Sequence, residues 1–317
     1  MVRKLKKKKS KILIYAAVLM MVGIAAFVYK YIIIPGYEHI FGIEYDDKTT
    51  SDSSVSISPD KLSSPNAILI RLKDHAVLMQ KNSEEKIYPA SLTKMMTAIV
   101  AIESLHNTKE EIKLTNFTFQ GLYGADASMA GFQPGEQVKA IDLLYGAMLP
   151  SGAECCIGLA DQIAGAEQNF VKMMNKKAAD LGMKNTHFEN VTGLQNENHY
   201  TTVKDLSILL NYALQNDTFR EIFTSSRHST QPTNKHPGGI TFYSTMFQEL
   251  DNQNIIGGEI LGGKTGYTDE AGLCLASLAK VDKQEYILIS AGARGNHHSQ
   301  QYNITDALVV YNSINKR

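Results

Sequence analysis

The 317-residue chain has no tryptophan, eight prolines and only three cysteines. Three cysteines cannot build the disulfide framework of a small secreted domain, and two of them, Cys155 and Cys156, are adjacent. We expect these two and Cys274 to be small buried apolar residues. A nucleophilic role for Cys155 is disfavoured because no histidine is visibly paired with it.

Histidine and carboxylate ligands at the spacing of a zinc site are also missing from the sequence. This argues against a zinc-dependent hydrolase, and no metal or cofactor is expected. His297 and His298 are interpreted as a solvated loop pair. For His199 a structural role is at least as plausible as a place at a reactive site.

Net charge is absent too, since 32 Lys and Arg balance 32 Asp and Glu. Seven of the positive residues stand among the first eleven, which contain no acid, so the rest of the chain has a net charge of −7 with histidine neutral. An acidic remainder does not favour nucleic-acid binding.

An uncharged run, residues 12–29, follows the basic start, and Tyr31 to Ile34 extend it past Lys30. Eighteen helical residues reach about 27 Å, close to the thickness of a bilayer core. We therefore predict a cytoplasmic tail at 1–11 and a single transmembrane signal anchor at 12–34, with the rest of the chain outside the cell. No convincing small-x-small cleavage site is present, which favours an uncleaved anchor.

The remaining chain divides by composition. Residues 35–65 include a Ser-rich stretch and are predicted to be an extracellular linker, and residues 66–317 a single catalytic domain. Strand patterns at 67–72, 76–80, 271–281 and 285–292 flank helical patterns from 91 to 214, and a last helix is expected at 305–313. Strands at both ends with helices between them predict an α/β domain around one sheet.

Ser-x-x-Lys occurs five times, starting at Ser58, Ser83, Ser91, Ser277 and Ser313. Only the match at Ser91 follows a proline and opens an apolar run typical of a helix packed into a core. One helical turn brings Lys94 to the Ser91 hydroxyl. A lysine buried near another cation, such as Lys264, loses its proton more easily and can then act as a base.

Two further motifs follow in order. Ser151-Gly152-Ala153-Glu154 has the pattern of a capping box, in which Ser151 would cap a helix. Lys264-Thr265-Gly266 follows two glycines and is interpreted as the start of an edge strand, where a substrate backbone can approach and a terminal carboxylate can be held.

The three motifs in this order resemble those of the serine-type D-alanyl-D-alanine carboxypeptidases, the low-molecular-weight penicillin-binding proteins of peptidase family S11. The resemblance extends over roughly Asn66 to Arg317 and includes residues 132–136, 143–150 and 198–202. It implies the serine β-lactamase/D,D-peptidase-like fold, in which helices flank an antiparallel five-stranded sheet.

The resemblance also implies roles for single residues. Ser91 would be the nucleophile, Lys94 its base, and Ser151 a proton relay to the leaving amine. The substrate-binding residues would be Lys264, Thr265, Gly266 and Tyr267, with the oxyanion between the backbone N–H groups of Ser91 and Tyr267. The substrate would be a peptidoglycan stem pentapeptide or its precursor, and β-lactams would be covalent inhibitors.

One position departs from the family pattern, because Ala153 stands where an asparagine is usual. Loss of that amide is expected to slow acylation or weaken β-lactam binding. The substrate end stays open between D-Ala-D-Ala and D-Ala-D-lactate, since relatives accompany some glycopeptide-resistance systems. Two other functions also stay open: a β-lactamase of the same fold, although no Glu-x-x-Leu-Asn follows Ser151, and a non-catalytic module that binds muropeptides or β-lactams.

Overall fold

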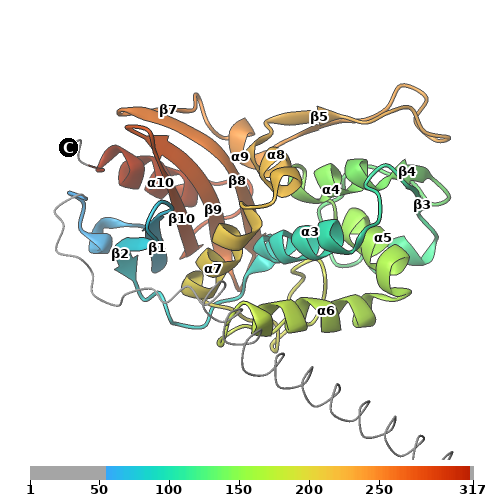
Figure 1. Ribbon diagram of the computed structural model, residues 1–317, viewed down its shortest axis with the longest axis horizontal. Helices are drawn as coiled ribbons and strands as arrows, with labels where there is room; N and C mark the ends of the chain where they lie inside the picture. The colour runs from blue at the N-terminus through green and yellow to red at the C-terminus, as the bar shows by residue number, and fades with distance from the viewer. Residues whose placement is uncertain (1–54, 315–317) are drawn as a thin grey trace, which may run out of the picture. The chain divides into compact units, whose positions relative to one another are not determined.

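Figure 1 shows the computed structural model, which describes residues 55–314. The predicted tail at 1–11, the predicted anchor at 12–34 and most of the predicted linker lie outside the described residues. Within residues 55–314 no helix is both long and apolar enough to cross a membrane.

One antiparallel sheet forms the centre of the described residues, with the strand order β2-β1-β10-β9-β8-β7. The strands β1 and β10 pair over Asn66–Ala291 to Arg71–Tyr286, so the first and last long strands of the domain are neighbours. The strands of this sheet are β1 (Asn66–Arg71), β2 (Ala76–Lys81), β7 (Asn254–Ile255), β8 (Gly258–Thr268), β9 (Gly272–Val281) and β10 (Gln284–Ala293).

Six strands replace the five that were expected. The additional strand, β7, has two residues and folds back on the start of β8, where Asn254 pairs with Glu259. A two-residue strand is too short to give an alternating pattern in the sequence. The antiparallel sheet with flanking helices is otherwise as predicted.

The sheet separates two apolar cores. Ile68 and Ile70 of β1 belong to the core shared with most helices, whereas the alternate residues Ala67 and Leu69 belong to the core beneath α10. Successive strand residues point to opposite faces, so a strand buried on both faces reads as an unbroken apolar run. The sequence of β1, with one arginine at its end, has this form.

Helices cover both faces, as Figure 1 shows: α10 packs on β9 and β10, while α7 packs on β1 and β10 from the other side. The helix α3 is buried on all sides from Thr93 to Ala101, which marks it as the central helix. The helices are α3 (Thr93–Ser104), α4 (Ala140–Met148), α5 (Ala153–Ala164), α6 (Glu167–Asp180), α7 (Val203–Ala213), α8 (Asp217–Thr224), α9 (Thr245–Gln248) and α10 (Tyr302–Asn312).

Short elements complete the fold. They are the 3-10 turns η2 (Pro59–Lys61), η3 (Ala90–Leu92) and η4 (Phe117–Phe119), and two small hairpins, β3 (Glu111–Lys113) with β4 (Gln137–Lys139) and β5 (Arg227–Ser229) with β6 (Thr241–Tyr243).

Residues 55–64, which the sequence analysis assigned to a flexible linker, contact the end of the chain. Val55 forms a β-bridge with Ile314, and the N–H groups of Ser63 and Ser64 donate to the carboxylate of Asp306 at 2.9 and 2.7 Å. Leu62 is buried in the core beneath α10. This part of the predicted linker is therefore bound to the domain, because two backbone N–H groups and an apolar side chain find partners there.

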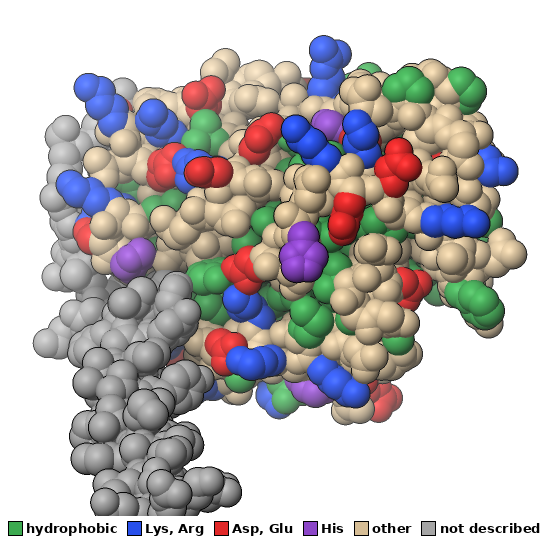
Figure 2. All heavy atoms as spheres, turned by 45° about the vertical axis from the view of Figure 1, so that its right-hand side comes forward, with side chains coloured by type: hydrophobic (Ala, Val, Ile, Leu, Met, Phe, Trp, Pro, Cys, Tyr) green, Lys and Arg blue, Asp and Glu red, His purple; other side chains and the backbone are tan. Residues whose placement is uncertain are grey.

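Charges of both signs are mixed on the surface. Figure 2 shows Lys, Arg, Asp and Glu side chains interspersed on one face, with no area of a single sign. That face offers no basic stripe of the kind that follows a nucleic-acid backbone.

Candidate active site

Ser91 lies in η3, immediately before the central helix α3, rather than inside that helix. Lys94, in the first turn of α3, donates a hydrogen bond from Nζ to Ser91 Oγ at 2.8 Å. Ser91 is half-buried, whereas Lys94 is 2% exposed. The structure thus places a half-buried hydroxyl in contact with a buried amine.

The backbone around Ser91 is strained. Ala90 has φ of 45°, a conformation that residues with a Cβ seldom adopt. Gly193 packs against it so closely that a Cβ on Gly193 would lie 1.8 Å from the Ala90 carbonyl oxygen. A strained residue costs about 1–3 kcal/mol and persists only where its surroundings enforce it, which is common at reactive sites.

Lys94 has a second partner that the sequence did not reveal: its Nζ also donates to the carbonyl oxygen of Thr192 at 2.7 Å. The carboxamide of Asn190 shapes that turn by accepting from the N–H groups of Thr192 and Gly193. Burial lowers the pKa of Lys94. A lowered pKa leaves more of the amine neutral, and a neutral amine can take the proton of Ser91.

Ser151 and Lys264 form a second hydroxyl–amine pair. Lys264, which is fully buried, donates from Nζ to Ser151 Oγ at 2.9 Å. Its pKa is held well below the usual lysine range, first by burial and then by the charge of Lys94. Ser151 has φ of 68°, a further strained residue with a Cβ at this site.

The capping-box prediction for Ser151 is wrong. The N-cap of α5 is Gly152 and has no side-chain cap, and the Ser151 hydroxyl binds Lys264 instead. The Glu154 carboxylate turns away to the backbone of Ala130 and Gly131. A serine in the left-handed conformation does not have the extended backbone of a capping residue.

Lys264-Thr265-Gly266 lies in the second half of β8, not at its start as expected. This half pairs with β9 on one side, and β7 reaches only Gly258 and Glu259 on the other. A Cβ on Gly266 would lie 3.0 Å from the backbone nitrogen of Ser91, so β8 passes directly beside the nucleophile turn. Glycine at 266 permits this approach.

Thr265 and Tyr267 have side-chain partners at the same edge. The hydroxyl oxygens of Thr265 and Thr245 are 2.6 Å apart, and the Thr245 N–H donates to Leu149, two residues before Ser151. Tyr267 donates from its hydroxyl to Asp269 at 2.6 Å, and its ring meets His297 edge to face. Thr245 was missed by sequence reasoning because no motif marks it.

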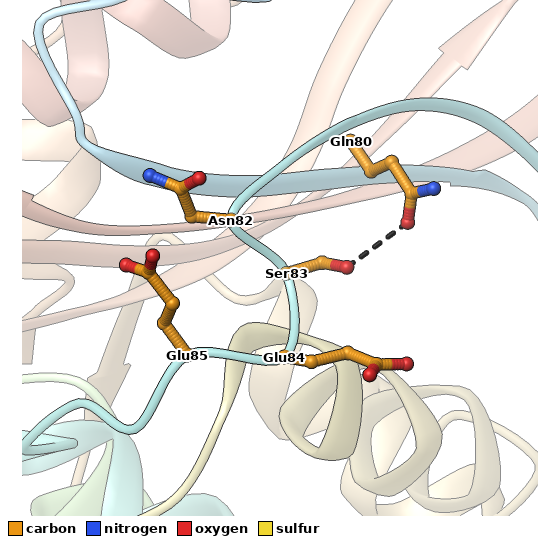
Figure 3. A pocket seen from close by; sticks show the side chains of 5 residues that line it. All are labelled: Gln80, Asn82, Ser83, Glu84 and Glu85. Carbon is orange, nitrogen blue, oxygen red and sulfur yellow. Dashed lines mark hydrogen bonds between the residues drawn. The ribbon is translucent and has the colours of Figure 1, made fainter.

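The remaining Ser-x-x-Lys matches within the described residues show no serine–lysine contact of this kind. Ser83 donates to Gln80 at 2.9 Å, in a surface hollow of about 660 Å³ (Figure 3). The fully buried Ser277 binds Tyr311. Among the matches whose serine and lysine are both described, Ser91 is the one that contacts its lysine.

The three cysteines and His199 also carry reactive groups, but their surroundings are those of structural residues. The three cysteines are free and buried, as predicted, and burial raises the pKa of Cys156 to about 12, which keeps its thiol protonated. Buried His199 binds the Thr93 hydroxyl at 2.8 Å, and burial lowers its pKa to about 4. His199 therefore stays neutral at physiological pH. Among residues 55–314 no group of three His, Cys, Asp or Glu side chains is arranged to hold a metal ion.

Comparison with known proteins identifies the same family that the three motifs resemble. The family model described as Peptidase_S11, D-alanyl-D-alanine carboxypeptidase, matches residues 53–295. The chain is 33% identical over 231 residues to D-alanyl-D-alanine carboxypeptidase DacF of Bacillus subtilis, covering 72% of this chain and 57% of the relative. To DacA of Escherichia coli it is 31% identical over 241 residues, covering 72% of this chain and 55% of the relative. The chain thus spans little more than half the length of these two relatives.

A relative nearer in length is the D-alanyl-D-alanine carboxypeptidase of Streptomyces strain K15, 31% identical over 209 residues, which are 64% of this chain and 71% of the relative. A solved variant of the Streptomyces K15 DD-transpeptidase superposes with a TM-score of 0.71 at 25% identity, covering 79% of this chain and 97% of that one. With the family model matched over most of the described residues, the chain belongs to the S11 family of D-alanyl-D-alanine carboxypeptidases.

Proposed function

We propose that this protein is a serine D,D-carboxypeptidase that removes the terminal D-alanine from peptidoglycan stem peptides ending in D-Ala-D-Ala. The observation that carries the proposal is the pair of hydroxyl–amine contacts, Lys94 with Ser91 and Lys264 with Ser151, made by two buried lysines. Acyl transfer to serine and then to water requires a nucleophile and a proton relay. Each of them has an amine as partner here.

In the proposed reaction, neutral Lys94 takes the proton of Ser91 while Ser91 Oγ attacks the carbonyl carbon of the penultimate D-Ala. The bond to the terminal D-alanine breaks, and the proton that Lys94 took passes through Ser151 to the departing amine, which leaves Lys94 neutral again. Water then attacks the ester, Lys94 takes its proton and returns it to Ser91 Oγ, and the shortened peptide and free Ser91 are released. Lys264 and Thr265 would hold the substrate carboxylate, because an amine N–H and a hydroxyl can both donate to an anion.

The oxyanion is proposed to lie between the backbone N–H groups of Ser91 and Tyr267. The close approach of Gly266 to the Ser91 nitrogen supports this, because it brings the two segments that carry these N–H groups together. Two N–H donors fixed in advance stabilise the tetrahedral intermediate without reorganisation.

Covalent labelling by a fluorescent penicillin tests the nucleophile assignment. We expect the full-length protein in detergent to be labelled, and the label to be lost in Ser91→Ala. The matched control is Ser58→Ala, since Ser58 opens another Ser-x-x-Lys but its side chain makes no capping hydrogen bond. A label that persists in Ser91→Ala would exclude Ser91 as the nucleophile.

The lifetime of the label separates the proposal from its alternatives. A β-lactamase would hydrolyse the acyl-enzyme rapidly and release the ring-opened penicillin, so its label would disappear. A D,D-carboxypeptidase would keep the label bound. A binding module would show the label but no release of D-alanine from a peptide. A peptide ending in D-Ala-D-lactate, offered beside D-Ala-D-Ala, shows which end is preferred.

We also propose that residues 12–34 anchor the protein in the cell membrane, with residues 35–54 as a tether and the catalytic residues outside the cell. The uncharged run behind a basic start supports this. The full-length protein should stay in the membrane fraction through an alkaline carbonate wash, and a form lacking residues 1–34 should not. Release of the full-length protein by carbonate would contradict the anchor.

A further inference from the structure

Glu154 is a buried carboxylate in the turn that carries Ser151, and the mechanism above gives it no part. It is fully buried, in the first turn of α5, one residue after Ala153. A buried carboxylate is costly unless its hydrogen bonds are satisfied. Its contacts therefore indicate what it does there.

The Glu154 side chain reaches a neighbouring segment, residues 128–131, here called the strap. Glu154 Oε1 accepts from the N–H groups of Ala130 at 2.8 Å and Gly131 at 2.9 Å. Glu154 Oε2 is buried and has no hydrogen-bond partner among the described residues. One oxygen thus holds two backbone N–H groups, and burial raises the pKa of the carboxyl group.

The strap is held against the Ser151 turn from the other direction too. The Ala153 N–H donates to the Ser128 carbonyl oxygen at 2.8 Å. A Cβ on Gly152 would lie 2.6 Å from the Cβ of Ala130, so the two backbones are in contact. Ser128 is exposed and Ala130 half-buried, which places the strap at the surface beside Ser151.

We propose that Glu154 is a positioning residue of the acyl-transfer site: its side-chain oxygen fixes the strap to the Ser151 turn. The inference rests on the proposed function in one respect, because the strap matters for acyl transfer only if Ser151 takes part in it. The fixing of the strap itself depends on the hydrogen bonds alone.

The first experiment measures the second-order rate of acylation by benzylpenicillin for the full-length protein, Glu154→Gln and Glu154→Asp. Glu154→Gln keeps a side-chain oxygen that can accept from both N–H groups, so its rate should stay within about twofold of the parent. Glu154→Asp is too short to hold the strap, so it should lose about three- to tenfold in rate. The control is Asp217→Asn, an exposed first-turn acid of α8, which should match the parent.

The second experiment measures amide hydrogen exchange of the strap. The Ala130 and Gly131 N–H groups should be protected in the parent and exchange at least tenfold faster in Glu154→Ala, with little change in α7. This readout does not require catalysis. If the parent were not acylated by penicillin, the proposed function would fail while the exchange measurement still decided the strap. A parent rate of acylation in Glu154→Asp, or unchanged exchange in Glu154→Ala, overturns the inference.

Discussion

Lys94 donates to two acceptors, the hydroxyl of Ser91 and the carbonyl oxygen of Thr192. Ser91 and Lys94 are one turn apart, so a helical pattern alone predicts their contact. Thr192 supplies a carbonyl oxygen to Lys94 from 98 residues further along the chain. A backbone carbonyl carries no residue-type signal, although Asn190 followed by Gly193 marks the turn that presents it.

Thr245 provides a test of how the substrate carboxylate is held. Its hydroxyl is 2.6 Å from that of Thr265, and either oxygen can donate. A bound carboxylate only accepts, so it favours the arrangement in which Thr245 donates to Thr265 and Thr265 donates to the substrate. Thr245→Val should therefore raise KM for a D-Ala-D-Ala peptide three- to tenfold with little change in kcat. Thr245→Ser, which keeps the hydroxyl, should restore the parent KM, and equal values in all three proteins would exclude this role.

Ala153 provides a second test at this scale. It is buried at the start of α5, with its N–H bonded to Ser128. If an asparagine amide can replace the family contact, Ala153→Asn should raise the acylation rate by about tenfold, the equivalent of a hydrogen bond of about 1.4 kcal/mol. The measurement is stopped-flow acylation by penicillin. An unchanged rate would mean that the site obtains this contact elsewhere.

Long apolar elements were predictable and short polar ones were not. The strands β9 and β10 are almost entirely buried, and their sequences show it. The hairpin of β5 and β6 escaped prediction because its three-residue strands expose most of their side chains. Its place is decided by side-chain contacts with distant segments, and these are not visible as a pattern.

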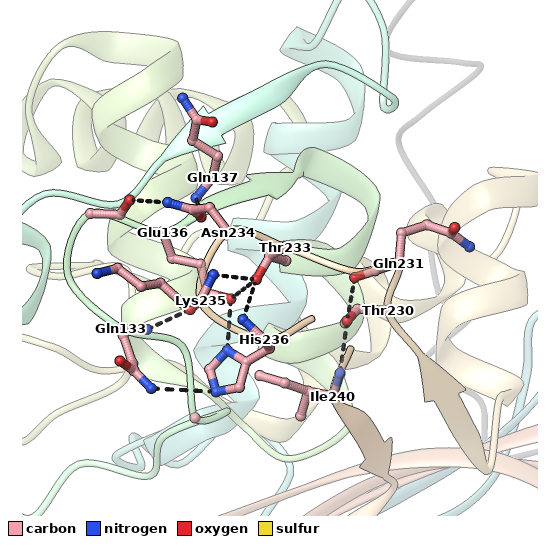
Figure 4. Close-up of polar contacts among 12 residues, drawn as sticks. Gln133, Glu136, Gln137, Thr230, Gln231, Thr233, Asn234, Lys235, His236 and Ile240 are labelled. Carbon is pink, nitrogen blue, oxygen red and sulfur yellow. Dashed lines mark hydrogen bonds and ion pairs between the residues drawn. The ribbon is translucent and has the colours of Figure 1, made fainter. Parts of the chain in front are cut away.

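One set of these contacts surrounds the buried carboxylate of Glu136, beside the loop that follows β5 (Figure 4). Glu136 is fully buried and accepts from the Thr233 hydroxyl at 2.6 Å, from His236 at 2.8 Å and from the Gln133 N–H at 2.8 Å. Asn234 extends the contact by accepting from the Gln137 N–H. The loop between β5 and β6 is thereby joined to the segment before β4.

Removal of this carboxylate should be costly, because three donors would lose their acceptor. We expect Glu136→Ala to lower the free energy of unfolding by about 3 kcal/mol. Glu111→Ala on the exposed side of β3 is the control and should change it by less than about 0.5 kcal/mol. Urea unfolding followed by fluorescence of the tyrosines measures both. Equal stability of the two variants would show that the cluster does not hold the hairpin loop.

At the scale of the molecule, the first and last long strands of the described chain pair in one sheet. β1 pairs with β10, and residues 55–64 contact α10. The presence of strands at both ends of the sequence predicted this closure. The sequence did not predict that Val55 to Ser64 pack against α10 and Ile314. Seven serines in residues 48–65 are typical of a solvated tether.

The same closure assembles the site from three distant segments. Ser91 lies before the central helix, Ser151 between two helices, and Lys264 on a strand near the end of the chain. Their side chains meet only when the sheet and the helices pack together. Catalysis is therefore expected to be lost as soon as the sheet separates from the helices.

The central claim, that Ser91 performs carboxypeptidase chemistry despite Ala153, is tested most directly by D-alanine release. The substrate is a peptide ending in D-Ala-D-Ala, and the proteins are the full-length chain, Ser91→Ala and Ser58→Ala. Release by the parent and by Ser58→Ala, with none by Ser91→Ala, is the predicted result. Release that persists in Ser91→Ala, or a parent that is labelled by penicillin but releases no D-alanine, would contradict the claim.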